Sequence, residues 1–313
     1  MESESSTKTV KKGKFKSKMA KHEALVGYLF MIPTIIGFSL YVGYPLLTSI
    51  YYALTEWDGL LPPKFVGLKN FAFIFKTDPT FFKSLEVTFL YVIYTVPISL
   101  ILGLLLALLL NKNIPGIKIF RTMYYLPVVL PSVAALVLWL FIFKSDYGLL
   151  NNLLRLVHLP PVPWLESSKT ALLSIGLVKF WGVGGTMIIF LSGLQSIPAD
   201  VFEAAEIDGA SWFRKFWNVT FPMITPIVFM QLITGMIGAF QSFNEAAILT
   251  KGGPNYSTYL ISYDIYQTAF VDNKFGRAIA EVWVLFVIIM IFTILIFRFS
   301  EQYVYYENDS FRK

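Results

Sequence analysis

Residues 85–110 read "LEVTFLYVIYTVPISLILGLLLALLL", and this run decides the class of fold. Glu86, near its beginning, is the only charged residue in it. An α-helix rises about 1.5 Å per residue, so about 20 apolar residues cross the hydrocarbon core of a bilayer. The run therefore predicts a transmembrane helix.

Similar runs lie on both sides of this helix. The chain has 313 residues, of which 56% are hydrophobic and 15% charged, whereas soluble domains carry about 25% charged residues. The short alternating segments of a membrane β-barrel are absent from the sequence. We therefore predict an all-α, polytopic membrane protein with six spans, at residues 25–53, 85–110, 123–143, 171–194, 223–249 and 278–299.

The two ends of the chain are polar. Seven Lys residues precede position 22, which suits either a nucleic-acid or anionic-lipid patch or a topology signal. We favour the topology signal because an apolar span follows directly, and Lys and Arg are more frequent on its side of the membrane when the tail itself, which contributes most of the bias, is counted. The predicted organisation is a basic cytoplasmic tail (1–24), a transmembrane domain (25–299) and a cytoplasmic C-terminal tail (300–313), with both termini inside.

The loop between spans four and five, residues 195–222, is charged and contains turn-forming residues. Asp200 and Glu203 have the spacing of a capping box at a helix N-terminus. Gly209 can adopt the left-handed conformation that ends this helix, and Ser211 can cap a second one, which Pro222 should stop. The loop therefore predicts two short cytoplasmic helices, either a plain surface feature or a rigid peg that fits a soluble partner.

The second helix of the loop has one apolar side. Trp212, Phe213, Phe216 and Trp217 form a stripe. Arg214 and Lys215 lie on the opposite side. We expect the stripe to pack against the transmembrane bundle or the membrane interface, which leaves the Glu/Ala face of the first helix free.

The loop resembles a known family. Its "EAAEIDGASWFRKFWNVTFP" is similar to the "EAA" loop in permease subunits of binding-protein-dependent ATP-binding-cassette (ABC) importers. The resemblance covers nearly the whole chain and is to sugar permeases of the maltose/glycerol-phosphate type. It rests on Glu203, Ala204, Ala205, Asp208, Gly209, Ala210 and Pro222, and on "GYLFMIPTIIGFSLYVGYPLLTSIYYALTEWDG", "FVGLKNF", "LGLLLALLLN", "FRTMYYLPVVLPSVAALVLW", "DYGLLNNLL" and "LTKGGPNYST".

The resemblance implies a function and a set of partners. In this family the loop is a coupling helix that docks on a cytoplasmic ATPase subunit, where Glu203 would meet a basic group. The chain has no GxxxxGK[ST] phosphate loop, so ATP and Mg would bind to the partner ATPases and this chain would carry no cofactor. The implied partners are a second permease, two ABC subunits, an extracytoplasmic sugar-binding protein and membrane lipid, without nucleic acid, in a bacterial or archaeal cell membrane.

Polar residues within spans are candidates for the substrate path, because a polar group in hydrocarbon is costly. Lys179 lies in span four and has two interpretations. It is structural, with its ammonium group reaching to the membrane surface or forming an ion pair, or it donates hydrogen bonds to a sugar hydroxyl or an acidic group of the substrate. Trp181 nearby offers a stacking face. Ser132 follows the two prolines of span three, which disturb that helix.

Span five contains a second polar cluster, formed by Gln241, Ser242, Asn244 and Glu245. Helical spacing places the first and last of these on one face. The cluster either lines the substrate path or holds helices together, and Glu245 can pair with Lys179. The resemblance points to spans three to five as the path.

No catalytic constellation or metal motif is found in the sequence. The chain has no cysteine, and neither a Ser–His–Asp set nor an HExxH motif occurs. The alternative to an importer subunit is a secondary transporter or channel that uses Glu245 and Lys179 as an ion relay. A membrane enzyme is disfavoured because the sequence contains no recognisable set of catalytic residues.

Overall fold

The computed structural model describes residues 18–112 and 114–300. Contacts between residues divide the chain into two compact units, residues 1–51 and 52–313. Most of the predicted basic tail and of the predicted C-terminal tail lies outside the described residues, so both remain predictions.

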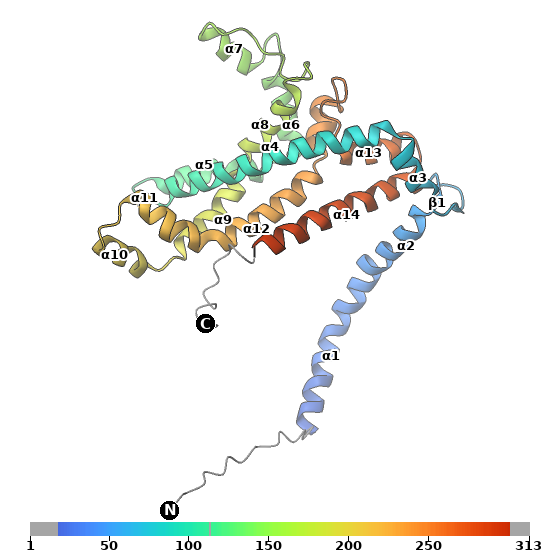
Figure 1. Cartoon of the computed structure of the whole chain (residues 1–313), viewed down its shortest axis with the longest axis horizontal. Helices are drawn as coiled ribbons and strands as arrows, with labels where there is room; N and C mark the ends of the chain where they lie inside the picture. Colours follow the sequence, from blue (N-terminus) through green and yellow to red (C-terminus); the bar gives the residue numbers. More distant parts are fainter. Residues whose placement is uncertain (1–17, 113, 301–313) are drawn as a thin grey trace, which may run out of the picture. The chain divides into compact units, whose positions relative to one another are not determined.

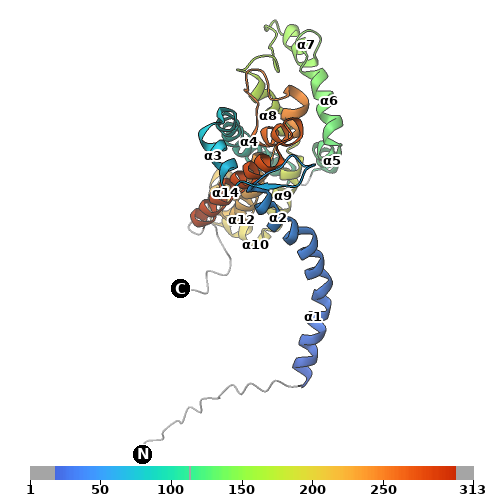
Figure 2. The same ribbon diagram turned by 90° about the vertical axis from the view of Figure 1, so that its right-hand side faces the viewer.

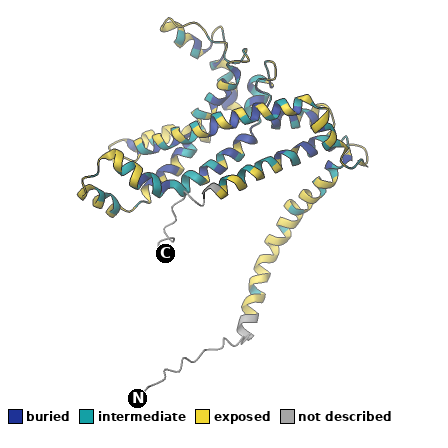
Figure 3. Cartoon of the chain, viewed as in Figure 1, coloured by how far each residue is buried: buried dark blue, intermediate teal, exposed yellow. Residues whose placement is uncertain are grey.

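The first unit is the span predicted at residues 25–53. It comprises α1 (Lys18–Phe38), the π-helical turn η1 (Ser39–Gly43) and α2 (Tyr44–Ala53), which follow one another without a break. Residues 22–53 are long and apolar enough to cross a membrane. The side chains of this helix are mostly exposed, as expected for a surface that meets lipid or another subunit (Figure 3).

The second unit begins with a small sheet that the all-α prediction did not contain. Strands β1 (Thr55–Glu56) and β2 (Lys64–Phe65) pair antiparallel, with Thr55 opposite Phe65. The side-chain amide of Asn70 donates to the backbone oxygens of Ala53 and Thr55, at 2.9 and 2.8 Å. Asn70 lies in helix α3 (Lys69–Lys76), so this amide fixes the hairpin to the helix that follows it.

Helix α4 (Pro79–Leu110) is the centre of this unit. Its first turn is capped by Asp78, whose Oδ1 accepts from the backbone N–H of Thr80 at 2.9 Å. The helix packs against α8, α9, α12 and α13, and Phe81, Tyr91 and Ala107 on it are fully buried. The predicted span at 85–110 is therefore confirmed as a helix.

Two of the predicted spans are bent pairs of helices. α5 (Ile117–Val129) and α6 (Ser132–Ile142) meet at 98°, at Leu130 and Pro131, because proline cannot continue the helical hydrogen bonds. α8 (Ala171–Trp181) and α9 (Gly184–Gln195) meet at 46°. The short helix α7 (Leu149–Leu156) lies at the far end of α6 (Figure 2).

The predicted fifth span is wrong at both ends. α10 (Ala199–Ile207) is followed by α11 (Trp212–Lys215), the π turn η2 (Phe216–Thr220) and α12 (Phe221–Phe240). The last three form one apolar helix, Trp212–Phe240, so the span starts earlier and ends earlier than 223–249. The chain then continues through η3 (Ala246–Thr250), α13 (Ile261–Tyr266), η4 (Gln267–Val271) and α14 (Phe275–Ser300).

The helices of the second unit have two distinct ends. α10 and α11 lie at one end of α4, α12 and α14, and α3 with β1 lies at the other (Figure 1). Among the described residues four helices are long and apolar enough to span a membrane, or up to six when each bent pair is one span. The all-helical, polytopic prediction is confirmed, and its count of six corresponds to the larger number.

Candidate coupling loop and substrate path

Helix α10 does not begin as the sequence predicts. Its N-cap is Pro198, and no side chain accepts a hydrogen bond from its first turn. Asp200 lies inside that first turn, where a carboxylate is favourable beside the free N–H groups. The predicted capping box of Asp200 with Glu203 is therefore wrong, and Pro198 sets the helix start through its fixed φ.

The end of α10 is a Schellman motif. The N–H of Ala210 donates to the oxygen of Ala205 at 2.9 Å, and the N–H of Gly209 donates to that of Glu206 at 3.0 Å. This pattern requires a left-handed residue, and Gly209 has φ of +70°. The predicted turn at Gly209 is confirmed, and it ends α10 just after Asp208.

The second helix of the loop is tied back to the first. The hydroxyl of Ser211 accepts from the N–H of Arg214 at 3.4 Å, as the sequence predicts. Lys215 Nζ lies 2.8 Å from Glu206 Oε1, and this pair lowers the pKa of the Glu206 carboxyl. The ion pair and the Schellman motif together make residues 199–215 a closed helical hairpin.

Pro222 does not end the second helix, contrary to the prediction. The π turn before it shifts the hydrogen bonds, so that the N–H of Phe221 donates to the oxygen of Phe216. Pro222 then occupies the first turn of α12, where its missing N–H costs little. The hairpin therefore continues directly into the membrane-spanning helix α12.

The aromatic stripe packs mainly on itself. Trp212 stacks on Phe216 with ring centroids 6.1 Å apart, and Phe213 meets Trp217 edge-on. Trp212 is 70% exposed. Phe216 and Trp217 also contact Phe221, which belongs to the same continuous helix. The described ring contacts of the stripe therefore do not include the expected packing against other helices of the bundle.

The outer side of α10 is a small exposed surface. Glu203, Ala204 and Asp208 are exposed, and Ala205 is half-buried. Ile207, one turn after Glu203, is 86% exposed. The sequence analysis missed Ile207, although an apolar side chain four residues after Glu203 shares its helix face. A charge beside an unpartnered apolar side chain is a suitable docking surface for another protein.

A cavity of about 280 Å³ lies between α4, α8, α9 and α12. Its polar lining includes Thr95, Lys179, Thr186, Gln231 and Thr234. Hydroxyl, amide and ammonium groups are donors and acceptors suited to a hydroxyl-rich ligand.

Lys179 is the only one of the predicted path residues in the described lining of this cavity. It lies in the last turn of α8, at the bend between α8 and α9, and is exposed. Trp181 lies beside it in sequence but packs edge-on against Trp139, with centroids 5.8 Å apart. The described ion pairs do not include the predicted pair of Lys179 with Glu245.

The other predicted path residues gather where two helices break. The amide of Asn244 donates to the hydroxyl of Ser132 at 3.5 Å, which joins the break after α12 to the break before α6. Gln241 is exposed and Glu245 is half-buried. The buried hydroxyl of Ser242 donates to the oxygen of Gly238 at 3.4 Å. The contact of Asn244 with Ser132 joins two helices, whereas the hydroxyl of Ser242 bonds to the end of its own helix. The roles of this cluster in the substrate path or in holding helices together both remain predictions.

Several lining residues were missed by the sequence analysis. They are polar or small residues at helical spacing in otherwise apolar spans. This spacing is the sequence pattern that could have identified them. Ser99, one turn after Thr95, has a buried hydroxyl with no hydrogen-bond partner among the described residues. The set is Thr95, Ser99, Thr186, Gln231, Thr234, Gly235 and Gly238.

The loop and the cavity share their helices. α9 lines the cavity through Thr186 and leads directly into the loop, and α12 lines it through Gln231 and begins as the second helix of the hairpin. A force on the hairpin therefore acts on two walls of the cavity through rigid helices. Within the described part of the chain no group of His, Cys, Asp and Glu residues is arranged to hold a metal ion.

An apolar helical unit with a polar cavity and an exposed hairpin is the architecture of a membrane transport component. Residues 99–305 match the family model for the inner membrane component of binding-protein-dependent transport systems. The chain belongs to this family: it is a multi-pass inner membrane permease subunit of an ABC importer, and the ATPase activity resides on a partner.

Individual relatives agree with this assignment. The chain is 38% identical to the probable ABC transporter permease protein YesP of Bacillus subtilis (strain 168), over 94% of this chain and 96% of that protein. It is 32% identical to the sn-glycerol-3-phosphate transport system permease protein UgpA of Agrobacterium fabrum (strain C58 / ATCC 33970), over 90% and 97%. The resemblance to maltose/glycerol-phosphate-type permeases is thereby confirmed.

A solved structure shows the same fold. The chain superposes on a chain from a bacterial ABC transporter involved in the import of the acidic polysaccharide alginate, with a TM-score of 0.78 and 22% identity. The match covers 91% of this chain and 98% of that one.

Proposed function

We propose that this permease subunit imports a carbohydrate. The relatives include a multiple sugar-binding transport system permease of Streptococcus mutans and a trehalose/maltose permease of Thermococcus litoralis. The cavity beside Lys179 offers hydroxyl and amide groups, and such groups match the hydroxyls of a sugar. Lys179, Gln231 and Thr234 are the residues that would contact the sugar.

The helical hairpin is the proposed attachment point for the ATPase subunit. The observation that carries this proposal is the unbroken helix Trp212–Phe240, which joins the hairpin to the wall of the cavity. Because the Schellman motif and the Lys215–Glu206 ion pair close the hairpin, it moves as one body with α12. Domain closure in the ATPase would then change the shape of the cavity.

The remaining partners follow from the same arrangement. Lys179 and Ser132 lie in apolar helices and Gln241 directly follows one, and all three are exposed in this subunit. A second permease that faces these groups would remove them from lipid and complete the path. The proposed assembly contains this chain, a second permease, two ATPase subunits and an extracytoplasmic sugar-binding protein.

The coupling role is tested with Glu203→Lys. Reversal of the charge at the centre of the exposed α10 surface should abolish co-purification of the ATPase subunits and lower sugar uptake more than ten-fold, because an ion pair becomes a repulsion. The protein should still insert in the membrane, since the side chain of Glu203 is exposed and takes part in none of the described ion pairs.

Two variants serve as controls. Glu23→Lys makes the same charge change at an exposed site outside the loop and should leave both readouts unchanged. Lys179→Ala, at the cavity, should alter uptake while the ATPase still co-purifies. Normal uptake and co-purification in Glu203→Lys would overturn the coupling role of this residue.

A further inference from the structure

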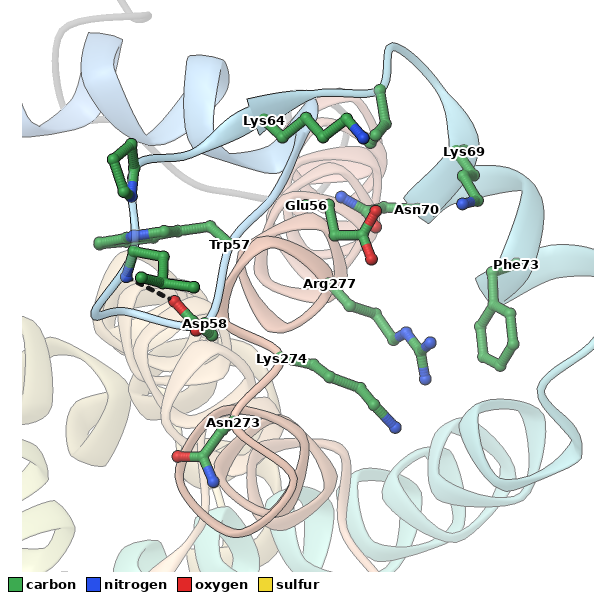
Figure 4. A pocket seen from close by; sticks show the side chains of 13 residues that line it. Glu56, Trp57, Asp58, Lys64, Lys69, Asn70, Phe73, Asn273, Lys274 and Arg277 are labelled. Atoms are coloured by element: carbon green, nitrogen blue, oxygen red, sulfur yellow. Dashed lines mark hydrogen bonds between the residues drawn. The ribbon is translucent and has the colours of Figure 1, made fainter.

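A second cavity, of about 500 Å³, is lined by side chains of β1, β2, α3 and α14 (Figure 4). α3 and β1 lie at the end of the second unit opposite α10 and α11 (Figure 1). The β1–β2 hairpin, α3 and the first turn of α14 form its walls. α14, which is long and apolar enough to span a membrane, begins at Phe275. The cavity lies at the first turn of this helix, where a span of that length would leave the hydrocarbon.

The charges around this cavity are predominantly positive. Lys64, Lys69, Lys274 and Arg277 line it, against the two carboxylates of Glu56 and Asp58. The Asp58 carboxylate is engaged by its own turn, because Oδ1 accepts from the N–H groups of Leu60 and Leu61 at 3.0 and 2.8 Å. Among the described residues Lys64, Lys69 and Arg277 form no ion pair.

Arg277 is positioned by a contact with an aromatic ring. Its guanidinium lies 3.6 Å from the centroid of the Phe73 ring and points into the open part of the cavity (Figure 4). A guanidinium stacked on an aromatic face keeps its N–H donors available for a phosphate. Arg277 and Lys69 thus approach the same space from two elements.

The walls of the cavity are rigid. A side chain at Gly276 would overlap the backbone oxygen of Thr55, so the start of α14 lies directly against β1. The N–H of Gly276 donates to the oxygen of Trp57 at 3.2 Å, and the ring of Trp57 contacts that of Phe275 at 5.7 Å. The positions of the bases are therefore set before any ligand binds.

Exposed apolar side chains adjoin the lining residues in sequence. Leu61 lines the cavity, and Leu60, Phe65 and Leu68, each next to a lining residue in the chain, are largely exposed, Leu60 to 91%. A soluble partner that occupied only the basic cavity would leave these side chains in water, which is unfavourable. Acyl chains beside an anionic headgroup satisfy both parts of the surface.

We propose that this cavity binds the headgroup of an acidic phospholipid, with the phosphate between Arg277 and Lys69 and the acyl chains along the exposed apolar side chains beside it. Basic groups near a membrane surface favour acidic lipids over neutral ones. This site lies at the end of the protein opposite the coupling hairpin and is independent of the proposed sugar path.

The test is native mass spectrometry of the full-length chain in detergent, titrated with phosphatidylglycerol or phosphatidylcholine of the same acyl chains. The wild-type chain should retain phosphatidylglycerol preferentially. Lys69→Gln with Arg277→Gln should retain it roughly thirty-fold more weakly, from the loss of two basic groups. Lys169→Gln with Arg155→Gln, which removes the same charges from another loop, should behave as the wild type.

A single variant and a competition experiment distinguish lipid binding from a loss of folding and from binding of free phosphate. Lys64 is exposed, so Lys64→Gln preserves the fold and should weaken retention about five-fold. Inorganic phosphate at lipid concentration should not displace the lipid. Unchanged phosphatidylglycerol retention in the double variant, or equally effective displacement by inorganic phosphate, would overturn the assignment to a lipid.

Discussion

The carboxyl group of Asp264, in α13, is buried against α4. It is 4% exposed, and its Oδ2 accepts from the hydroxyl of Ser84 at 3.1 Å. Burial, followed by the nearby negative charge of Asp78, raises its pKa from 3.8 to about 6. The folded chain therefore binds a proton over a pH range in which the unfolded chain has released it.

This pKa shift predicts a pH dependence of stability. Because the folded pKa is the higher one, the free energy of unfolding should fall as pH rises from about 4 to about 6, and then level off. The change is on the order of 2–3 kcal/mol. Thermal unfolding of Asp264→Asn in detergent checks this: the variant should melt higher than the wild type near pH 7.

The same variant provides its own control at low pH. Asparagine keeps an oxygen for the Ser84 hydroxyl but carries no charge, so the two proteins should converge near pH 4, where Asp264 is protonated. An equal difference in melting temperature at both pH values would show that packing, and not ionisation, separates them.

Among the structural elements, the helical hairpin of residues 199–215 depends on the backbone conformation of Gly209. Its φ of +70° is unfavourable for residues with a Cβ, and most of all for β-branched ones. Gly209→Val should destabilise the hairpin by about 1–2 kcal/mol. Hydrogen exchange of residues 199–215 should then be roughly ten-fold faster, while exchange in α4 is unchanged.

Gly209→Asn is the matched variant, because asparagine tolerates the left-handed conformation. It should restore slow exchange in the hairpin. Equal exchange in the valine and asparagine variants would mean that the turn does not depend on this backbone angle.

Local chemistry made part of this element predictable. Gly209 and Ser211 act through their own backbone and hydroxyl group, so their roles follow from their neighbours in sequence. The effect of Pro222 was not predictable in the same way, because it follows a π turn, in which the N–H of Phe221 bonds to the oxygen five residues earlier, and the helix continues through it. The start of α10 was also predicted wrongly. Pro198, whose φ is fixed by its ring, takes the N-cap position there in place of a side chain that accepts a hydrogen bond.

The cavity was only partly predictable from sequence. Lys179 is conspicuous as a charge in an apolar span, and the structure places it in the lining. Thr95 and Gln231 are less conspicuous, and their convergence depends on how α4 packs against α12. Periodicity identifies polar residues on each helix, but packing determines which of them share a space.

At the scale of the whole molecule, function depends on rigid connections between distant places. The second unit has the helical hairpin at one end and α3 with β1 at the other (Figure 1). Helix Trp212–Phe240 joins the helical hairpin to the cavity beside Lys179 without a break. In the proposed function, this helix would convert a movement of the helical hairpin into a change in the shape of that cavity.

Site-specific cross-linking tests this coupling most directly, because the chain contains no cysteine and a single one can be introduced. Ile207→Cys, labelled with a thiol-reactive photo-cross-linker in the assembled importer, should cross-link to the ATPase subunit. Leu156→Cys in α7, 75% exposed, is the control and should not. Cross-linking of Ile207→Cys to lipid, or to this chain alone, would contradict the coupling role of the hairpin.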